Sequence, residues 1–410
     1  MKNIQYTLSL LFTLIPASVS LAAGSNAWQS TPVTAITGLE LKLSEPINGE
    51  MLSVLLSHDN SNNTNRLDAI TIRQPFDGSD VSPPTRIDFS PNLFALGEIC
   101  VENNQAYIPY IKDFNVGVIK YDGLNFSSLT IPATMTNNYD NANCAVTNDG
   151  IFILTHDLTD QETEIFKSTN SGVSYNMFGN YNSVGPFSGG IREFITADYD
   201  SGLAMTVSQM NTGMVRSTRF FTSDAFPVFD HVNLTMLMQP TGFTFVKESS
   251  GGINGDHMSF SFNGDGQAEL FNIPTANPAA FTMTHLGPIN SMGSQFNFQG
   301  GSGYSVPDLD GNPMVHQVMW GNLYEINHDM SPPTFTVDSD YPLMGIGGPV
   351  DGCVIKQMRG NDIIEIEGLI IGPTVGPGGT SLYLKRLEAD PIFAGRFELT
   401  PTIIYDADCP

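Results

Sequence analysis

The fold is decided by a two-strand unit of sequence that is clearest in Ile151-Phe152-Ile153-Leu154 and the following Glu164-Ile165-Phe166-Lys167-Ser168. Two short apolar runs joined by residues that favour turns predict a β-hairpin. The same unit occurs seven times along the chain, and the second strand of each copy is centred on an isoleucine or an aromatic residue. These central residues are Ile72, Ile119, Phe166, Phe220, Phe271, Tyr324 and Tyr383.

The interval between successive central residues is nearly regular, at 47, 47, 54, 51, 53 and 59 positions. A period of roughly 40–50 residues is typical of the blades of a β-propeller, each of which is a small antiparallel sheet. We therefore predict an all-β fold, a seven-bladed β-propeller of four-stranded antiparallel blades, with the central residues in the third strand of each blade. A single domain is expected because each blade buries its faces only against its neighbours.

The N-terminus has the pattern of a secretory signal. Lys2 supplies the charge, Leu8–Ile15 the apolar segment and Ser20-Leu21-Ala22 a small-x-small cleavage sequence. We expect residues 1–22 to be a signal peptide and residues 23–410 a single β-propeller domain. No later uncharged apolar stretch reaches the ~18 residues of a membrane span. The sequence thus predicts a secreted or periplasmic protein with no membrane span.

The chain is strongly acidic, with 17 lysines and arginines against 42 aspartates and glutamates and a formal net charge of −25. This balance disfavours nucleic acid as a partner, since nucleic acid is bound through lysine and arginine, and it disfavours an anionic membrane surface. The acidic charge fits either the solubility of a secreted protein or the binding of cations. We expect a monomer.

The four cysteines are Cys100, Cys144, Cys353 and Cys409. In an oxidising compartment they are expected to form two disulfides, for which three pairings are possible. We favour Cys100–Cys144, because these residues have matching positions at the start of consecutive blades. The other pair, Cys353–Cys409, would join the chain end to the last blade.

The segment Ser168-Thr169-Asn170-Ser171-Gly172-Val173-Ser174-Tyr175 resembles an Asp-box, the Ser-x-Asp-x-Gly-x-Ser/Thr-aromatic turn of sialidase-like propellers. Asn170 stands in place of the usual Asp, and Tyr175 in place of the usual Trp. Such a turn needs polar side chains that accept from backbone N–H groups, a glycine with positive φ and an aromatic ring packed beneath. Weaker copies occur at Tyr121–Phe126 and Thr222–Phe229. In the sialidase-like (BNR, Asp-box) superfamily the box is structural and lies on the face away from the active site.

The catalytic pattern of that family is not matched. Its first clamp arginine normally occurs in a Phe/Tyr-Arg-Ile-Pro segment, and the N-terminal arginines Arg66, Arg73 and Arg86 lack this context. The catalytic residues of this chain therefore stay unknown, and the resemblance concerns the fold.

A second segment, Phe262-Asn263-Gly264-Asp265-Gly266-Gln267-Ala268-Glu269, is similar to the calcium loop of integrin-type propeller repeats. Alternating oxygen donors and glycines at a sharp turn suit Ca²⁺. The expected side-chain ligands are Ser261, Asn263, Asp265 and Glu269, with Ser261 in place of the usual first Asp. The alternative is a plain hairpin turn, because Asn-Gly and Asp-Gly are strong hairpin signals.

Three His-Asp pairs, His58-Asp59, His156-Asp157 and His328-Asp329, are each followed two residues later by Ser or Thr. A histidine beside a carboxylate suits metal binding or base catalysis, but the pairs occur in separate blades. Capping of the following turn is the favoured interpretation.

The predicted ligand face consists of the loops between blades and the second-to-third-strand turns. Aromatic rings beside carboxylates on these loops suit the stacking and hydrogen bonding of a sugar. We predict a binding or interaction protein for a glycan or another extracellular ligand, because no complete catalytic constellation is present. The alternative is a divergent glycan-active hydrolase with two loop carboxylates as acid and base. The candidate ligand-binding residues are Tyr139, Asp140, Tyr181, Arg192, Asp338, Asp340 and Tyr341.

Overall fold

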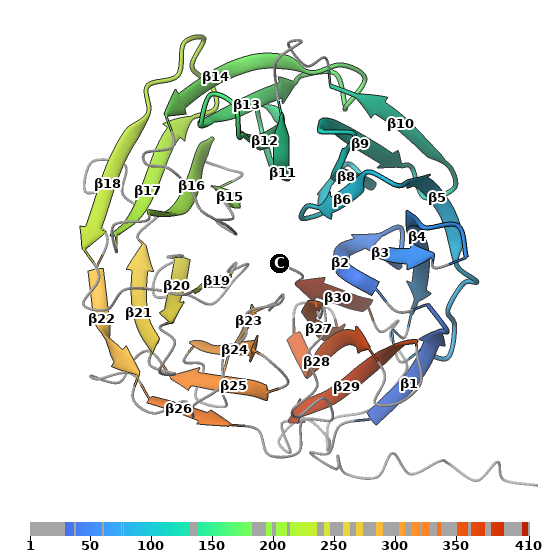
Figure 1. Ribbon diagram of the computed structural model, residues 1–410. Coiled ribbons are helices and arrows are strands. Elements are labelled where there is room, and N and C mark those ends of the chain that lie inside the picture. The colour runs from blue at the N-terminus through green and yellow to red at the C-terminus, as the bar shows by residue number, and fades with distance from the viewer. Residues whose placement is uncertain are drawn as a thin grey trace, which may run out of the picture.

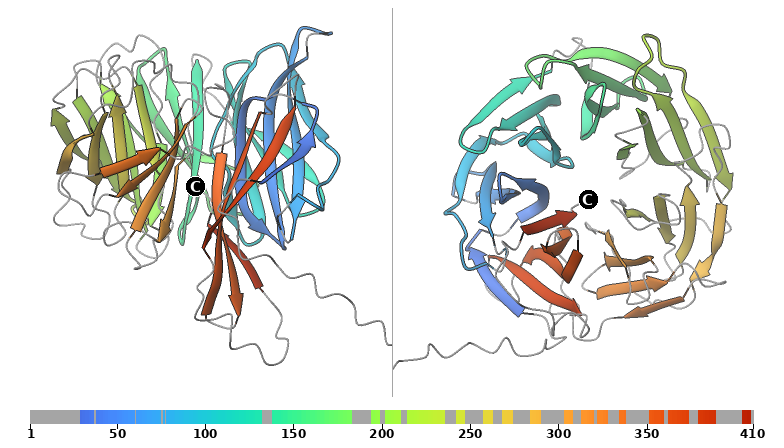
Figure 2. Two further views of the ribbon diagram at one scale, coloured as in Figure 1. Left: turned by 90° about the horizontal axis from the view of Figure 1, so that it is seen from below. Right: turned by 180° about the vertical axis from the view of Figure 1, so that it is seen from behind.

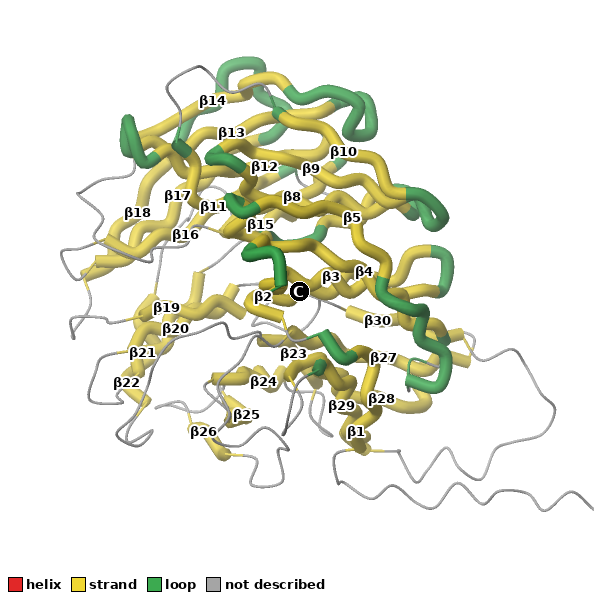
Figure 3. The backbone as a smooth tube through the Cα atoms, turned by 45° about the vertical axis from the view of Figure 1, so that its right-hand side comes forward, coloured by secondary structure: helices red, strands yellow, loops and turns green. Residues whose placement is uncertain are grey.

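The computed structural model describes 29–131 and 138–182 with a few single-residue gaps, 194–235 with short gaps, and the strands from there to residue 408. Side chains are described within 31–131, 138–182, 216–233 and 379–382, and at residue 202. Strands and turns make up the described part of the chain, which contains no helix (Figure 3). No helix among these residues is long and apolar enough to cross a membrane.

The first four sheets are antiparallel and follow one another along the chain. Sheet one contains β2 (Gly38–Ile47), β3 (Glu50–Asp59), β4 (Thr64–Arg73) and β5 (Thr85–Ser90). Sheet two contains β6 (Leu93–Leu96), β7 (Cys100–Glu102), β8 (Gln105–Lys112), β9 (Asn115–Tyr121) and β10 (Phe126–Thr130). Sheet three contains β11 (Tyr139–Thr147), β12 (Gly150–Asp157), β13 (Glu162–Ser168) and β14 (Asn176–Asn182). Sheet four contains β15 (Phe194–Asp198), β16 (Leu203–Met210), β17 (Met214–Phe221) and β18 (Asp230–Thr235).

Three further antiparallel sheets complete the described strands. Sheet five contains β19 (Gly242–Val246), β20 (His257–Phe262), β21 (Ala268–Ile273) and β22 (Thr284–Ile289). Sheet six contains β23 (Gly303–Pro307), β24 (Pro313–Met319), β25 (Asn322–Asn327) and β26 (Thr334–Val337). Sheet seven contains β1 (Gln29–Thr34), β27 (Asp351–Arg359), β28 (Asp362–Pro373), β29 (Thr380–Glu388) and β30 (Ile404–Asp408).

The sheets are arranged around a central axis, and in sheets one to six the first strand lies nearest the axis and the last at the rim (Figure 1). The seven central residues predicted from the sequence all lie in the strand next to the outermost one, namely β4, β9, β13, β17, β21, β25 and β29.

Sheet seven is built from both ends of the chain. Its strand order is β1-β29-β28-β27-β30, so the N-terminal strand forms the outer edge and the C-terminal strand the inner edge. Thr380 Oγ1 donates to the carbonyl of Ile36, where the chain passes from β1 to sheet one, at 2.7 Å. In side view the strands of this sheet extend beyond the others (Figure 2). Four strands were predicted here, and the fifth is β30, whose partner β27 lies far from it in the sequence.

Apolar side chains fill the space between neighbouring sheets. Between sheets two and three, Tyr107 and Val118 meet Ile153 and Phe166 in one buried cluster. Strand β12 is buried at every position, because one face packs on sheet two and the other on sheet four. Strands covered on both faces have continuous apolar sequence, as the run from Ile151 does.

The inner strand of sheet two is interrupted, and Pro109 of β8 explains why. Proline has no N–H to donate to a neighbouring strand. Strands β6 and β7 therefore pair with β8 on either side of Pro109, and Gly97 between them donates its N–H to the Pro109 carbonyl at 2.9 Å. The freed N–H groups of Leu96 and Glu98 donate to the side chains of Glu40 and Asn143. The break thus ties the inner strands of three sheets together.

At this break the inner strands of sheets two and three approach so closely that a Cβ on Gly97 would overlap the carbonyl oxygen of Ala142. The same approach brings Cys100 and Cys144 within disulfide range, with 5.9 Å between their Cα atoms. The predicted Cys100–Cys144 disulfide is confirmed. Cys409 lies outside the described residues, so its pairing with Cys353 stays a prediction.

The turn from β13 to β14 has the hydrogen bonds that its sequence predicts. The Asn170 Oδ1 atom accepts from the Ser174 N–H at 3.0 Å, and the Ser168 hydroxyl accepts from the Gly172 N–H at 3.0 Å. Gly172 has a φ of 75°, and the Tyr175 ring is buried beneath the turn. The turn is closed by side chains, so its shape does not depend on a neighbouring molecule.

We expect Gly97→Ala to lower the free energy of unfolding by about 3 kcal/mol or more, because the new methyl group meets backbone that cannot move aside. Gly49→Ala is the control. Gly49 also lies in a turn, but the nearest atom to its added Cβ is 3.8 Å away. Gly49→Ala should therefore lower the free energy of unfolding only by the strain of placing alanine in a left-handed backbone conformation, about 1–2 kcal/mol. Chemical denaturation measures both, and equal losses would show that Gly97 is not a contact point.

For the β13–β14 turn, Asn170→Ala should cost about 1–2 kcal/mol of stability, because the Ser174 N–H loses its acceptor. Asn170→Asp restores that acceptor and should recover most of the loss. Urea denaturation of the two variants tests this, and an aspartate variant as unstable as the alanine variant would contradict it.

Candidate functional site

We call the edge of a sheet that carries the turn between its second and third strands the connecting edge. The site is built on the connecting edge of sheet three, which contains Asn138–Asn141, the β12–β13 turn and the end of β14. The sequence placed candidate ligand-binding residues on this edge, and the structure brings Tyr139, Asp140 and Tyr181 there. The other four candidates, Arg192, Asp338, Asp340 and Tyr341, lie outside the described residues.

Tyr139 is buried, with 1 % of its surface exposed, and its hydroxyl donates to Glu164 Oε2 at 2.5 Å. Glu164 is itself 7 % exposed and lies in the middle of the sheet, between Thr155 of β12 and Asn180 of β14. A buried carboxyl group needs such a donor, because leaving it without one costs a large desolvation energy. Sequence reasoning missed Glu164, and the alternation of β13 alone does not indicate its partner.

Asp140 is the member of this group that reaches solvent, with 35 % of its side chain exposed. It sits at a β-bulge, since Tyr139 pairs with Asp157 and Asn141 with His156, which leaves Asp140 unmatched. The bulge turns the Asp140 carboxylate toward His156, and its Oδ1 atom lies 3.1 Å from Nδ1 of the buried imidazole. Bulges often redirect a side chain in this way next to functional sites.

Asp157 and Asp59 cap the turns that follow their strands. Asp157 Oδ1 accepts from the N–H groups of Thr159 at 2.8 Å and Asn138 at 3.3 Å. Asp59 accepts from the N–H and the hydroxyl of Ser61, and these hydrogen bonds lower the pKa of Asp59. Capping is confirmed for these two His-Asp pairs, and the third, His328-Asp329, lies outside the described residues.

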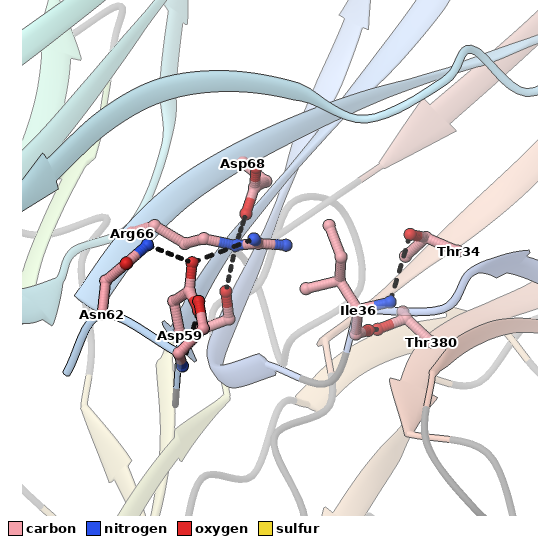
Figure 4. A network of polar contacts seen from close by, with 9 residues as sticks. Thr34, Ile36, Asp59, Asn62, Arg66, Asp68 and Thr380 are labelled. Carbon is pink, nitrogen blue, oxygen red and sulfur yellow. Dashed lines mark hydrogen bonds and ion pairs between the residues drawn. The ribbon is translucent and has the colours of Figure 1, made fainter. Parts of the chain in front are cut away.

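On sheet one, the connecting edge carries an ion-pair network around Arg66 (Figure 4). Arg66 Nε lies 2.7 Å from Oδ2 of the buried Asp68, and Nη1 lies 4.0 Å from Asp59 Oδ2. The guanidinium also donates to Ser57. The Arg66 guanidinium thus neutralises the Asp68 carboxylate inside the sheet, so Arg66 has a structural role here.

Tyr181 faces sheet four and lies against an imidazole that the sequence did not single out. Its ring centroid is 5.4 Å from that of His231, whose Nδ1 lies 2.9 Å from Thr218 Oγ1. Burial against these groups, together with the nearby Arg216 guanidinium, lowers the pKa of His231. Arg216 bonds to Asn233 at 3.0 Å. The position of Arg216 in a third strand is only a weak sequence signal for a functional role, because arginines in these outer strands are commonly solvated.

His231 thus lies against the buried Tyr181, with Arg216 and Asn233 on the same two strands of sheet four. Asp140 lies on the inner strand of sheet three, with β12 and β13 between it and the Tyr181 strand. Among the side chains that the structure describes, no group of three His, Cys, Asp or Glu residues is placed to hold a metal ion. The arrangement suits the recognition of a polar ligand through hydrogen bonds.

The proposed calcium loop lies between β20 and β21, on the same connecting edge of sheet five. Ser261 and Glu269 are directly opposite each other in the hairpin, in the register Ser261↔Glu269. Asn263 and Asp265 lie outside the described residues.

The sequence matches no protein-family model and no curated protein. Its structure is similar to that of YCF48 from Cyanidioschyzon merolae, with a TM-score of 0.51 at 10% identity, covering 88% of this chain and 98% of that one. It is also similar to BBS1N in its complex with ARL6DN, with a TM-score of 0.50 at 8% identity, covering 89% of this chain and 96% of that one. The similar solved structures include β-propellers. The chain has a β-propeller fold. Because the sequence identities to these solved structures are so low, the similarity shows the fold alone.

We expect Tyr139→Phe to lower the free energy of unfolding by about 1–3 kcal/mol, because Glu164 loses a donor inside the sheet. Tyr121→Phe is the matched control, since that hydroxyl donates to the Gly123 carbonyl near the surface. Thermal and urea denaturation measure the difference. A loss at Tyr121 as large as that at Tyr139 would contradict a special role for the buried pair.

The lowered pKa of His231 predicts a pH dependence of stability. The unfolded state, with a pKa near 6.5, binds the proton more readily than the folded state. The contribution of His231 is therefore present above about pH 6.5 and is lost as pH falls toward the folded pKa. Between about pH 7.5 and pH 5, the wild type should lose more stability than His231→Gln. Parallel curves for the two proteins would show that His231 does not titrate in this way.

Proposed function

We propose that the chain is a secreted, seven-bladed β-propeller of the sialidase-like Asp-box type that binds a glycan or another polar extracellular ligand at its connecting edge. The seven described sheets and the turn around Asn170 support this architecture. The acidic charge of −25 fits a secreted protein that stays soluble and monomeric.

The observation that favours binding over hydrolysis is the engagement of the carboxylates on sheet three. Glycoside hydrolysis needs two carboxyl groups about 5–10 Å apart that can reach the scissile bond and water. Glu164 is buried under the Tyr139 hydroxyl, Asp157 caps a turn, and Asp140 faces His156. These contacts hold the sheet together and leave Asp140 as the one carboxylate of the three that meets solvent.

A glycan screen tests the proposal. We expect wild-type protein to retain a subset of immobilised glycans, and Asp140→Asn and Arg216→Gln each to weaken retention at least about tenfold by removing one charged hydrogen bond. Asp80→Asn and Arg73→Gln, each of which removes one partner of an exposed ion pair at the opposite edge, are the controls and should bind like the wild type. Release of reducing sugar from the retained glycans would instead support the hydrolase alternative. Equal effects of all four substitutions would contradict a site on sheet three.

We further propose that Ser261, Asn263, Asp265 and Glu269 bind Ca²⁺. The hairpin register that sets Ser261 opposite Glu269 supports this. With the first Asp replaced by Ser, the expected dissociation constant is in the ~10⁻⁴–10⁻³ M range of extracellular modules. Millimolar Ca²⁺ should then raise the melting temperature relative to chelator, through RT ln(1 + [L]/Kd). Asp265→Ala should abolish the shift, while Asp160→Ala keeps it. A shift that survives in Asp265→Ala would leave the segment a plain hairpin turn.

We also propose the Cys353–Cys409 disulfide. Strands β27 and β30 pair in the register Val354↔Asp408, and Cys353 and Cys409 are the sequence neighbours of these two paired residues, which supports the proposal. Peptide mapping without reductant should recover the two cysteines in one linked fragment, separate from the Cys100–Cys144 fragment. Recovery of free thiols at both positions would remove the proposal.

A further inference from the structure

The edge opposite the connecting edge carries the third-to-fourth-strand turns, and three successive turns present a large apolar side chain to solvent. Leu124, Val173 and Phe226 are 86%, 69% and 89% exposed, in sheets two, three and four. They occupy the turns that resemble one another in sequence. Single exposed apolar residues are ordinary, but one in each of three successive turns on the same edge is not explained by chance placement.

The exposed apolar side chains are concentrated where sheets three and four meet. The segment before β18 lies directly on β14, because a Cβ on Gly179 would be 2.7 Å from Pro227 and 2.9 Å from Phe229. Pro227 and Phe229 thus face sheet three, and their neighbours Phe226 and Val228 face outward. Strands β17 and β18 run side by side, and β14 is the outer strand of the neighbouring sheet (Figure 1). We define the rim patch as Val173, Met177, Phe226 and Val228, which are 69%, 48%, 89% and 69% exposed.

The turns that carry the rim patch are held in place from within the chain. Lys167 donates to the Thr222 carbonyl at 2.7 Å and lies 5.3 Å from the centroid of the Phe152 ring. This contact joins the end of β13 to the turn of the next sheet. The Thr222 hydroxyl also donates to Asp149 Oδ2 at 2.7 Å. A preformed apolar surface loses little conformational entropy when a partner binds it.

Charge identifies the kind of partner. Two lysines reach these turns, and both donate to backbone carbonyls: Lys167 to Thr222, and Lys120 to Ser171, two residues before Val173. Asp224 precedes Phe226 by two residues, and Asp149 lies beside the same turn. A second copy of the chain would bring another net charge of −25, and an anionic lipid surface would also repel these carboxylates. A positively charged partner would be attracted.

We propose that the rim patch is a docking surface for a protein segment that has an apolar face flanked by lysine or arginine. The patch lies on the edge opposite the ligand-binding residues, so it serves a second interaction. A partner at the rim would leave the connecting edge accessible.

The test uses the full chain and a fluorescent synthetic amphipathic peptide of about 14 residues, with leucine on one face and lysine on the other. We expect binding by anisotropy that weakens with added salt, and at least a tenfold weaker Kd for the double variant Phe226→Ser, Val228→Ser. Phe89→Ser is the matched control, because Phe89 is 61% exposed on β5 of another sheet. Asp140→Asn should leave peptide binding unchanged, which separates this result from the glycan site.

Three results would overturn the proposal. The first is equal affinity of the double variant and the wild type, with both proteins melting at the same temperature. The second is equal binding of a peptide in which glutamate replaces lysine. The third is a different occupant: a dimer in sedimentation, or binding to phosphatidylcholine vesicles, that the double variant abolishes while the peptide does not bind.

Discussion

Sheets one, two and three are apolar on both faces, and this one constraint determines how the described part of the molecule is arranged. A sheet with two apolar faces cannot end against water, so each must have a neighbour on either side. Strand β12, buried along its whole length between sheets two and four, shows the result. The requirement leaves the strand ends as the places where polar chemistry is possible. The ion pair of Arg66 with Asp68 and the hydrogen bond of Tyr139 to Glu164 are the exceptions, and both satisfy charges within a sheet.

Much of the fold could be predicted because its determinants are local. The apolar runs and their interval indicated the hairpins, and six of the seven central residues lie in the third strand from the axis, as predicted. Tyr383 lies in β29, the fourth strand of sheet seven, because β30 occupies the inner edge. The Asn170 turn was predictable for the same reason, since every hydrogen bond that closes it spans four residues or fewer. The broken inner strand of sheet two was missed, although Pro109 in the middle of a strand is a signal for it. The composition of sheet seven was also missed, because β1 and β30 join partners that the sequence gives no local reason to pair.

The candidate site was predictable to a lesser degree. The sequence assigned Tyr139, Asp140 and Tyr181 to loops between blades. They lie instead within strands β11 and β14, at the strand ends on one edge of sheet three. The sequence did not indicate which of these side chains are buried in contacts that support the sheet and which are exposed to solvent. Tyr139 is committed to Glu164, 25 positions away, and Tyr181 to His231 in the next sheet. Such pairings depend on the register of several strands together, and a pattern within one strand does not contain that information.

The position of β1 has a consequence for the order in which the protein folds. This strand leaves the ribosome early, yet its partner β29 begins at Thr380, some 350 residues later. The first strand must stay unpaired until almost the whole chain has been made, and it then closes a loop of nearly maximal length. Long-range pairing of this kind slows folding. Closure of the ring by β1 and β29 is therefore expected to be a late step of folding, after the sheets between them have formed.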